Sequence, residues 1–318
     1  MRRIKKCTVF LLVLCLLLNL AGCAAAQKPL RVTLVLKTVT EVAEFWGTLL
    51  SGVEKAAEEY GVELKVLTSP REIDIDKQIE LIRQVTADKP DVMILSAADY
   101  DRCAEATEEA IAAGIGVVAI DTDVNAAGRA CFVGSNSYEI GLEMGRAMAS
   151  YLPEGGKVAV IQHMLTTTTG IERTRGVLDA LNEAGNIEIL GSFCCDNSTE
   201  QAQTITTELL SADPEIRGFV CTNEVCNVGA ANALVELGMG YVVGCDNSQR
   251  QIQFLEQNII QAIVTQRPFN MGYVAVQQAV RVANGEQTDD FVEVSCVLIT
   301  RENMYTQENQ KLLFPVLR

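Results

Sequence analysis

Polar and aromatic residues follow short apolar runs throughout this sequence, and their types suit hydrogen bonding to hydroxyl groups. They are Phe45-Trp46, Ser96, Asp99, Asp121 to Asp123, Thr166 to Thr169, Arg173, Asp196-Asn197, Asn223-Glu224, Asp246-Asn247 and Gln266 to Pro268. Carboxylates, amides and a guanidinium hydrogen bond to hydroxyl groups, and an aromatic ring packs on the C–H face of a sugar ring. The set is typical of a binding site for a neutral polyol.

Several of these residues also have a structural interpretation, and both interpretations stay open. Asp and Asn after a strand commonly cap a helix or form a turn, which applies to Asp99, Asp123, Asp196 and Asn247. An aromatic pair that opens a helix is often part of the core. Arg175 competes with Arg173 for a role in the site, and either could form surface ion pairs.

The residue types and their spacing give little support for an enzyme active site or a metal site. The single histidine, His163, is expected to be a packed polar residue, and no pair of C-x-x-C units is present. The sequence lacks a G-x-G-x-x-G after its first strand and a G-x-S-x-G elbow. We therefore expect no catalytic residue, no cofactor and no metal. Most cysteines after residue 100 lie in apolar runs, so we expect mostly free, buried thiols.

Apolar runs of strand length alternate with amphipathic runs of helix length along the chain. The predicted strands are 31–36, 62–67, 92–95, 117–120, 157–162, 188–191, 218–221, 241–245, 261–265 and 291–299. The predicted helices are 44–60, 74–88, 102–113, 138–152, 170–184, 199–212, 225–237, 248–257 and 270–284, followed by a short tail. This alternation predicts an α/β fold of two doubly wound, Rossmann-like lobes with parallel sheets. Such sheets bind ligands at the carboxyl ends of their strands, here in a cleft between the lobes.

The composition agrees with two globular lobes and excludes some partners. The chain has 318 residues, 48% of them apolar, and 41 acidic against 26 basic side chains. A net charge of -15 opposes nucleic-acid binding, which needs a basic face. We expect a monomer whose N-terminal lobe comprises 30–134 and 267–293, and whose C-terminal lobe comprises 135–266 and 294–318. Three hinge segments join the lobes, near 134–136, 266–268 and 294–295.

The first 22 residues have the pattern of an export signal. Four basic residues precede an apolar run at 7–20, which is shorter than an ordinary membrane-spanning helix. The run ends in Leu20-Ala21-Gly22-Cys23, which resembles the lipobox of bacterial lipoproteins. That resemblance implies cleavage before Cys23, acylation of its thiol, a linker at 23–29 and attachment to the bacterial cell membrane from outside the cytoplasm. The alternative is an ordinary secretory signal.

Five sequence segments resemble the type I periplasmic binding proteins, specifically the ribose- and galactose-binding branch that serves ABC importers. They are QRPFNMGYVA at 266–275, VGCD at 243–246, TNE at 222–224, RTRG at 173–176 and VAID at 118–121. The resemblance covers essentially the whole chain after the signal. It implies a ligand shell of Phe45, Trp46, Asp121, Arg173, Asn223, Asp246 and Gln266, with Ser96, Thr122 and Asn197 as secondary candidates.

Three departures from that family leave the ligand open. Residues 42–44 replace an Asn-Asn-Pro, Thr122 stands where the family has an Arg, and Asn197 stands at an aromatic position. A pentose is therefore not assured, and another hexose, an inositol, an autoinducer-like polyol or a different small polar solute remains open.

The resemblance implies a solute-binding protein that closes on its ligand and delivers it to an ABC permease. One alternative is a lipoprotein with the same fold that reports to a membrane histidine kinase or a chemoreceptor. A sugar-responsive transcription regulator is opposed by the signal peptide and by the lack of a helix-turn-helix before residue 31. An exported enzyme is the least favoured alternative, since the catalytic motifs named above are missing.

Overall fold

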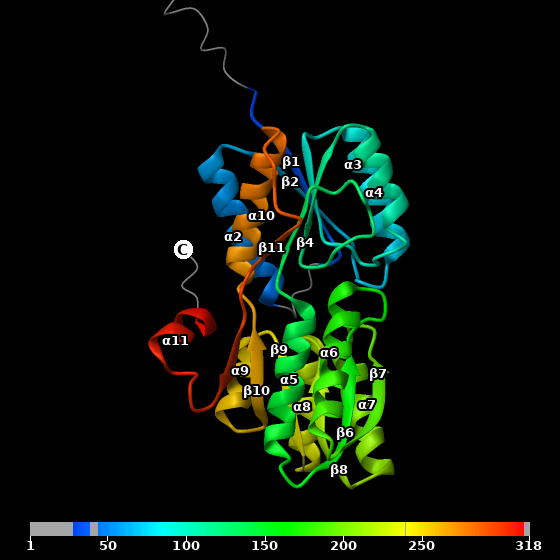
Figure 1. The fold of residues 1–318 in the computed structure, drawn as a ribbon, viewed down its shortest axis with the longest axis vertical. Helices are drawn as coiled ribbons and strands as arrows, with labels where there is room; N and C mark the ends of the chain where they lie inside the picture. Colours follow the sequence, from blue (N-terminus) through cyan, green and yellow to red (C-terminus); the bar gives the residue numbers. More distant parts are fainter. Residues whose placement is uncertain (1–27, 39–43, 239, 315–318) are drawn as a thin grey trace, which may run out of the picture.

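Two α/β lobes lie end to end along the long axis of the molecule (Figure 1). This computed structural model describes residues 28–38, 44–238 and 240–314. The predicted signal peptide, Cys23 and residues 42–43 lie outside these ranges. No helix in the described ranges is long and apolar enough to cross a membrane.

The first lobe has a six-stranded parallel sheet with helices on both faces. Its strand order is β11 (Phe291–Glu293), β5 (Cys131–Gly134), β4 (Gly116–Ile120), β3 (Val92–Leu95), β1 (Arg31–Leu36) and β2 (Glu63–Thr68). Successive residues of β1 point to opposite faces of the sheet. Leu34 packs with α2 (Glu44–Tyr60) and α10 (Pro268–Ala283), whereas Val35 packs with α3 (Ile75–Asp88) and α4 (Ala104–Ala112).

The second lobe repeats this architecture. Its strand order is β12 (Val297–Thr300), β10 (Ile260–Thr265), β9 (Tyr241–Cys245), β8 (Ile216–Cys221), β6 (Gly156–Gln162) and β7 (Ile187–Cys194). One face is covered by α5 (Ser137–Tyr151) and α6 (Thr168–Ala184). The other is covered by α7 (Thr199–Ala212), α8 (Glu224–Leu237), α9 (Gln249–Glu256) and α11 (Gln307–Leu313).

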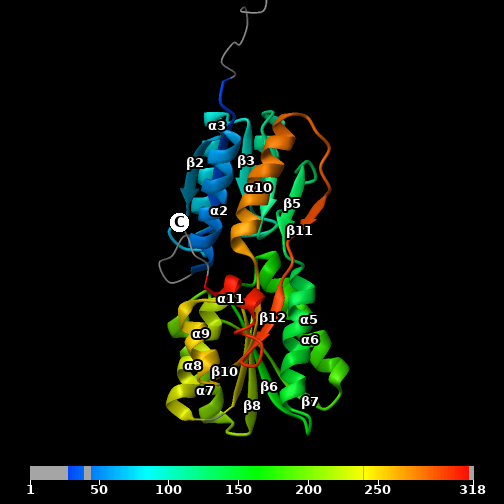
Figure 2. The same ribbon diagram turned by 90° about the vertical axis from the view of Figure 1, so that its left-hand side faces the viewer.

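The chain passes between the lobes at three places that lie side by side in both views (Figures 1 and 2). The passages are β5 to α5, β10 to α10, and β11 to β12. The first and third are tied together, because Val294 N–H donates to Gly134 O at 2.8 Å and the Ser135 hydroxyl donates to Val294 O at 2.7 Å.

The predicted class of two doubly wound α/β lobes is confirmed, but two local predictions are wrong and two short elements are missing from the prediction. The run 291–299 is not one strand: the chain leaves the first sheet after Glu293 and enters the second at Val297. The second sheet is not wholly parallel, because β12 runs antiparallel to β10. The four-residue strand β5 and the helix α11 were not predicted. Both are too short for a clear period, and α11 is held through Leu313 in the second lobe's core.

The eight cysteines in the described ranges are all free, and six are buried. Burial raises the pKa of several of these thiols, to about 11 for Cys103 and Cys131. The thiols whose pKa is raised are therefore neutral and of low reactivity.

Candidate ligand-binding site

A cavity lined mainly by buried side chains lies between the two lobes at the carboxyl ends of their strands. The space between its atoms is about 410 Å³ when the part open to solvent is included. Its lining residues are Lys37, Phe45, Trp46, Glu72, Asp121, His163, Thr169, Arg173, Asn197, Asn223, Glu224, Val225, Asp246 and Gln266. All seven residues of the expected ligand shell line it, as does Asn197.

The other two secondary candidates, Ser96 and Thr122, do not line this cavity. Both are fully buried, and their hydroxyl oxygens lie 3.1 Å apart. The Thr122 hydroxyl also donates to Ala97 O at 2.7 Å. These hydroxyls therefore hydrogen bond within the first lobe, where they join the loops after β3 and β4.

The first lobe contributes a buried ion-pair cluster and two aromatic rings. Lys37, just after β1, places its Nζ 2.9 Å from Glu72 Oε1 and 3.4 Å from Asp121 Oδ2. Burial opposes the charge on Lys37, but Glu72 and Asp121 outweigh it and raise the pKa of this lysine. Lys37 Nζ also lies 5.6 Å from the ring centre of Trp46, which packs edge-on against Phe45. The charge of Lys37 is thus compensated within the wall, and the two carboxylates outnumber the single cation.

The second lobe contributes a guanidinium, a carboxylate and an amide at the base of the cavity. Arg173 Nη1 donates to Thr222 O at 2.8 Å and lies 3.8 Å from Asp246 Oδ2. Gln266 Nε2 donates to Asp246 Oδ1 at 2.6 Å. Gly141 on α5 allows α6 to pack closely, because a Cβ at that position would collide with Arg173 O. The glycine thus helps to set the position of the arginine.

A chain of amide hydrogen bonds crosses from the second lobe to the first. Asn223, the N-cap of α8, accepts from Cys226 N–H at 3.0 Å, and its Nδ2 donates to Asn197 Oδ1 at 2.8 Å. Asn197 Nδ2 in turn donates to Glu72 Oε2 at 2.8 Å in the opposite lobe. Asn197, at the position where the resembled family has an aromatic residue, therefore forms a contact between the lobes.

Two carboxylates at matching places in the lobes share an uncommon backbone conformation. Asp121 follows β4 with φ 62°, and Asp246 follows β9 with φ 68°. Aspartate tolerates this left-handed region better than most residues, but it still costs energy. The strain turns both side chains toward the cavity.

Lys37 and Glu72 belong to the cavity but were not among the expected site residues. Lys37 directly follows a predicted strand, so the strand-end rule could have found it. Glu72 lies in a loop with no distinctive pattern, and only the fold brings it to the site. His163 lines the cavity as a packed residue: burial, then Lys37 and Arg173, hold its pKa well below the usual value, and its Nδ1 lies 2.7 Å from Thr222 Oγ1.

Two buried polar atoms of the cavity wall have no hydrogen-bond partner within the protein. They are Arg173 Nε, a donor, and Glu224 Oε2. A third such atom, Glu72 Oε1, differs from these two because it is ion-paired with Lys37. Buried polar groups are normally satisfied, so the two free atoms mark where a bound molecule would complete the hydrogen bonding. No three His, Cys, Asp or Glu side chains in the described ranges are placed to hold a metal ion.

The lobes touch around this cavity. Tyr100 N–H donates to Thr166 O at 3.0 Å, and Asp123 N–H donates to the Thr168 hydroxyl at 3.0 Å. On another side, Gln249 N–H donates to Glu44 Oε1 at 3.1 Å. The structure therefore shows the closed arrangement of the lobes.

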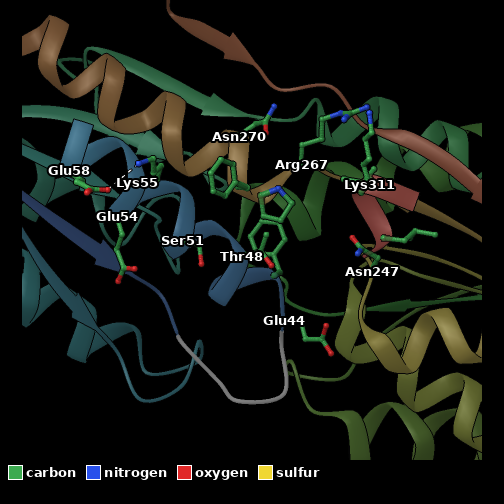
Figure 3. Close-up of a pocket in the computed structure, with 15 residues that line it drawn as sticks. Glu44, Thr48, Ser51, Glu54, Lys55, Glu58, Asn247, Arg267, Asn270 and Lys311 are labelled. Carbon is green, nitrogen blue, oxygen red and sulfur yellow. Dashed lines mark hydrogen bonds and ion pairs between the residues drawn. The ribbon is translucent and has the colours of Figure 1, made fainter. Parts of the chain in front are cut away.

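A larger groove on the outer surface has a different character. It includes about 2110 Å³, much of it open to solvent, between α2, α10 and α11. Figure 3 shows Arg267 beside Lys311 at one end, and Glu54, Lys55 and Glu58 along α2 at the other. The groove lies along helices rather than at strand ends, so the cavity between the lobes is the better candidate for a ligand site.

Comparison with known proteins agrees with this geometry. The D-allose-binding periplasmic protein of Escherichia coli K12 is 24% identical over 303 residues, which are 90% of this chain and 96% of that protein. A solute-binding protein of a carbohydrate transporter from Agrobacterium radiobacter, in complex with D-arabinose, has the same fold with a TM-score of 0.86 at 23% identity. That alignment covers 90% of this chain and 99% of the other.

A second structure and a family model extend the match. The structure of a sugar transporter from Clostridium phytofermentans is 28% identical with a TM-score of 0.79, over 85% of this chain and 98% of that one. The family model described as a periplasmic binding protein domain matches residues 33–287, which include most of both lobes and every lining residue of the cavity. The chain therefore belongs to the periplasmic binding protein family.

Proposed function

We propose that this protein captures a monosaccharide or related polyol outside the cytoplasm and delivers it to an ABC permease. The observation that carries the proposal is the cavity between the lobes, whose polar groups come from both lobes and whose wall keeps Arg173 Nε and Glu224 Oε2 without partners. The sugar ligands named for the related proteins support it.

The charges of the cavity favour a neutral ligand. Each cation already faces carboxylates: Lys37 pairs with Glu72 and Asp121, and Arg173 lies by Asp246. An anionic ligand would have to compete for these cations while it is desolvated. Hydroxyl groups can instead donate to Asp121 and Asp246 and accept from Arg173 and Asn223, while Phe45 and Trp46 pack on a ring face.

Hinge closure is the proposed mechanism of capture. A ligand that touches Asp121 in one lobe and Asp246 in the other makes both sets of contacts only when the lobes are closed. Binding therefore shifts the population toward the closed state, which is the state that docks on the permease. The three passages between lobes, at 134–137, 265–268 and 293–297, act as the hinge, and divide 30–134 plus 267–293 from 135–266 plus 294–318.

The proposal includes a monomer that is tethered to the membrane through acylated Cys23 after removal of residues 1–22. Its basis is the lipobox-like sequence at the end of the apolar run. Mass spectrometry of the protein from a native-like bacterial host tests this part, since the tether predicts a diacylglyceryl group on Cys23 and a Cys23→Ala variant without lipid.

A binding screen tests the central proposal. A soluble form that begins at Gln27 is heated with D-allose, D-ribose, D-arabinose, D-galactose or myo-inositol, and hits are measured by isothermal titration calorimetry. We expect at least one neutral compound to raise the melting temperature, because a ligand of the native state stabilises it by mass action. Galacturonate and ribose 5-phosphate are the matched anions. Tighter binding of an anion than of every neutral compound would contradict the proposal.

A further inference from the structure

Glu224 is a buried carboxyl group that the resemblance did not assign to the ligand shell. It is the first residue of α8, its side chain lines the cavity, and it is only 3% exposed. Its Oε2 has no hydrogen-bond partner in the protein. A carboxyl oxygen left in this state needs a partner from a bound molecule.

Acidic groups from both lobes surround this side chain. Asp246, from the loop after β9, belongs to the same lobe, whereas Glu44 begins α2 in the opposite lobe. Arg173, the cavity's cation from the same lobe, is already engaged by Thr222 O and Asp246. The remaining charged groups of the cavity, Lys37, Glu72 and Asp121, form their own cluster in the first lobe, and His163 is neutral.

We propose that Glu224 is a ligand-contacting residue that acts as a neutral carboxylic acid, and that closure on the ligand takes up one proton at this side chain. The proton comes from solvent and binds Oε2, which then donates a hydrogen bond to an oxygen of the ligand. This inference rests on the proposed function, because it concerns the same cavity and the same closing motion.

The physical basis is the difference between the open and closed cleft. In the closed structure, burial first, then the charges of Asp246 and Glu44, raise the pKa of Glu224 to about 8 from an ordinary 4.5. The neighbouring Ser248 side chain and Glu44 backbone act in the opposite direction but do not cancel the rise. When the lobes separate, Glu44 moves away and solvent reaches Glu224, so the carboxyl returns toward its ordinary pKa.

The sign of the pH dependence follows from this difference. The closed state binds the extra proton, so ligand affinity rises as pH falls from about 8 toward 4.5 and is level outside that window. One fully coupled proton changes affinity by about tenfold per pH unit. We expect the dissociation constant for a neutral sugar to increase by at least about 20-fold between pH 5.5 and pH 7.5.

The test uses the sugar among D-allose, D-ribose and D-arabinose that stabilises the soluble protein most. Calorimetry at pH 5.5 and 7.5, in buffers of different ionisation enthalpy, gives affinity and the number of protons taken up. We expect uptake of close to one proton at pH 6.5 for the wild type. Glu224→Gln keeps a neutral hydrogen-bonding group, so its uptake and most of its pH dependence vanish. Glu236→Gln, an exposed change on the same helix, retains the wild-type slope.

Two results overturn the inference while leaving sugar capture intact. One is sugar binding without proton uptake by the wild type. The other is an unchanged pH slope in Glu224→Gln. Carbon-13 NMR of the labelled wild type with bound sugar measures the titration of Glu224 directly and does not depend on whether a variant folds. A Glu224 carboxyl that titrates near 4.5 in the complex would also refute the inference.

A third experiment distinguishes failure of this inference from failure of the proposed function. If none of the sugars binds at any pH, sugar capture fails, and small-angle X-ray scattering of the free protein decides the proton coupling. We expect a smaller radius of gyration at pH 5.5 than at pH 8, with no such change in Glu224→Gln. Equal radii for the wild type at the two pH values would overturn the inference.

Discussion

The two walls of the cavity differ in how far the protein satisfies its own polar groups. In the first lobe, Lys37 is ion-paired with both Glu72 and Asp121 beside Trp46. In the second lobe, Arg173 Nε and Glu224 Oε2 remain without partners. The charged groups of the first wall are thus paired within the protein before a ligand binds. The two unpartnered atoms of the second wall gain partners only from a ligand. We infer that the first lobe supplies shape and an apolar face, and that the second supplies most of the binding energy.

Loss of the second lobe's arginine should have the largest effect. Arg173→Ala removes a buried donor and leaves Asp246 without its cation, so we expect at least about 100-fold weaker sugar binding by calorimetry. Arg175→Ala is the matched control on the same helix, because Arg175 is exposed and paired with Glu172. Circular dichroism checks that both variants are folded. Equal affinities for the two variants would show that the second wall does not dominate.

The aromatic face of the first lobe should matter less. Trp46→Leu keeps an apolar side chain but removes the flat ring, and we expect about tenfold weaker binding of a neutral sugar. Trp46 is the only tryptophan in the chain, so quenching or enhancement of its fluorescence also reports binding directly in the wild type. If Trp46→Leu lost as much affinity as Arg173→Ala, the second lobe would not supply most of the binding energy.

The charge cluster of the first lobe should affect ligand choice more than affinity. Glu72→Gln leaves an oxygen that can accept from Asn197, but it removes one of the two carboxylates that pair with Lys37. We expect about fivefold weaker binding of the neutral sugar and a smaller preference for that sugar over its uronate, because Lys37 becomes available to an anion.

The control for this change is Glu80→Gln, an exposed member of an ion pair on α3. Calorimetry with D-galactose and D-galacturonate, or with whichever sugar and uronate pair gives a hit, measures both effects. An unchanged preference between the two ligands would mean that Lys37 does not face the ligand.

The sequence predicted the architecture well because each element carries its own pattern. Periodic apolar residues marked helices such as Glu44–Tyr60 and strands such as Arg31–Leu36 with the bounds that the structure has. Cys131–Gly134 and Gln307–Leu313 were missed, because so few residues cannot show a period and their stability comes from neighbouring elements. The break between Glu293 and Val297 is set by the passage between lobes, which leaves no mark on the β pattern.

The cavity was predictable where a residue follows a strand and unpredictable where only tertiary structure brings it in. Asp121, Asp246 and Gln266 all follow strands and all line the cavity. Glu72 reaches it from a loop before α3, and nothing local marks that position. Thr122 shows that a position after a strand is not sufficient. Its neighbour Asp121 points into the cavity, while its own side chain points into the lobe.

A substitution of Ser96 should have the smallest effect on sugar affinity, because this residue lies behind the first wall of the cavity and does not line it. Its hydroxyl lies 3.1 Å from that of Thr122, and neither residue lines the cavity. Ser96→Ala removes one buried hydrogen bond, so we expect the free energy of unfolding in urea to fall by about 1 kcal/mol. Sugar affinity should stay within about twofold, since one net hydrogen bond inside the lobe exists equally in the open and closed states. A tenfold loss of affinity at unchanged stability would instead place Ser96 in contact with the ligand, and the first wall would then depend on the ligand as the second does.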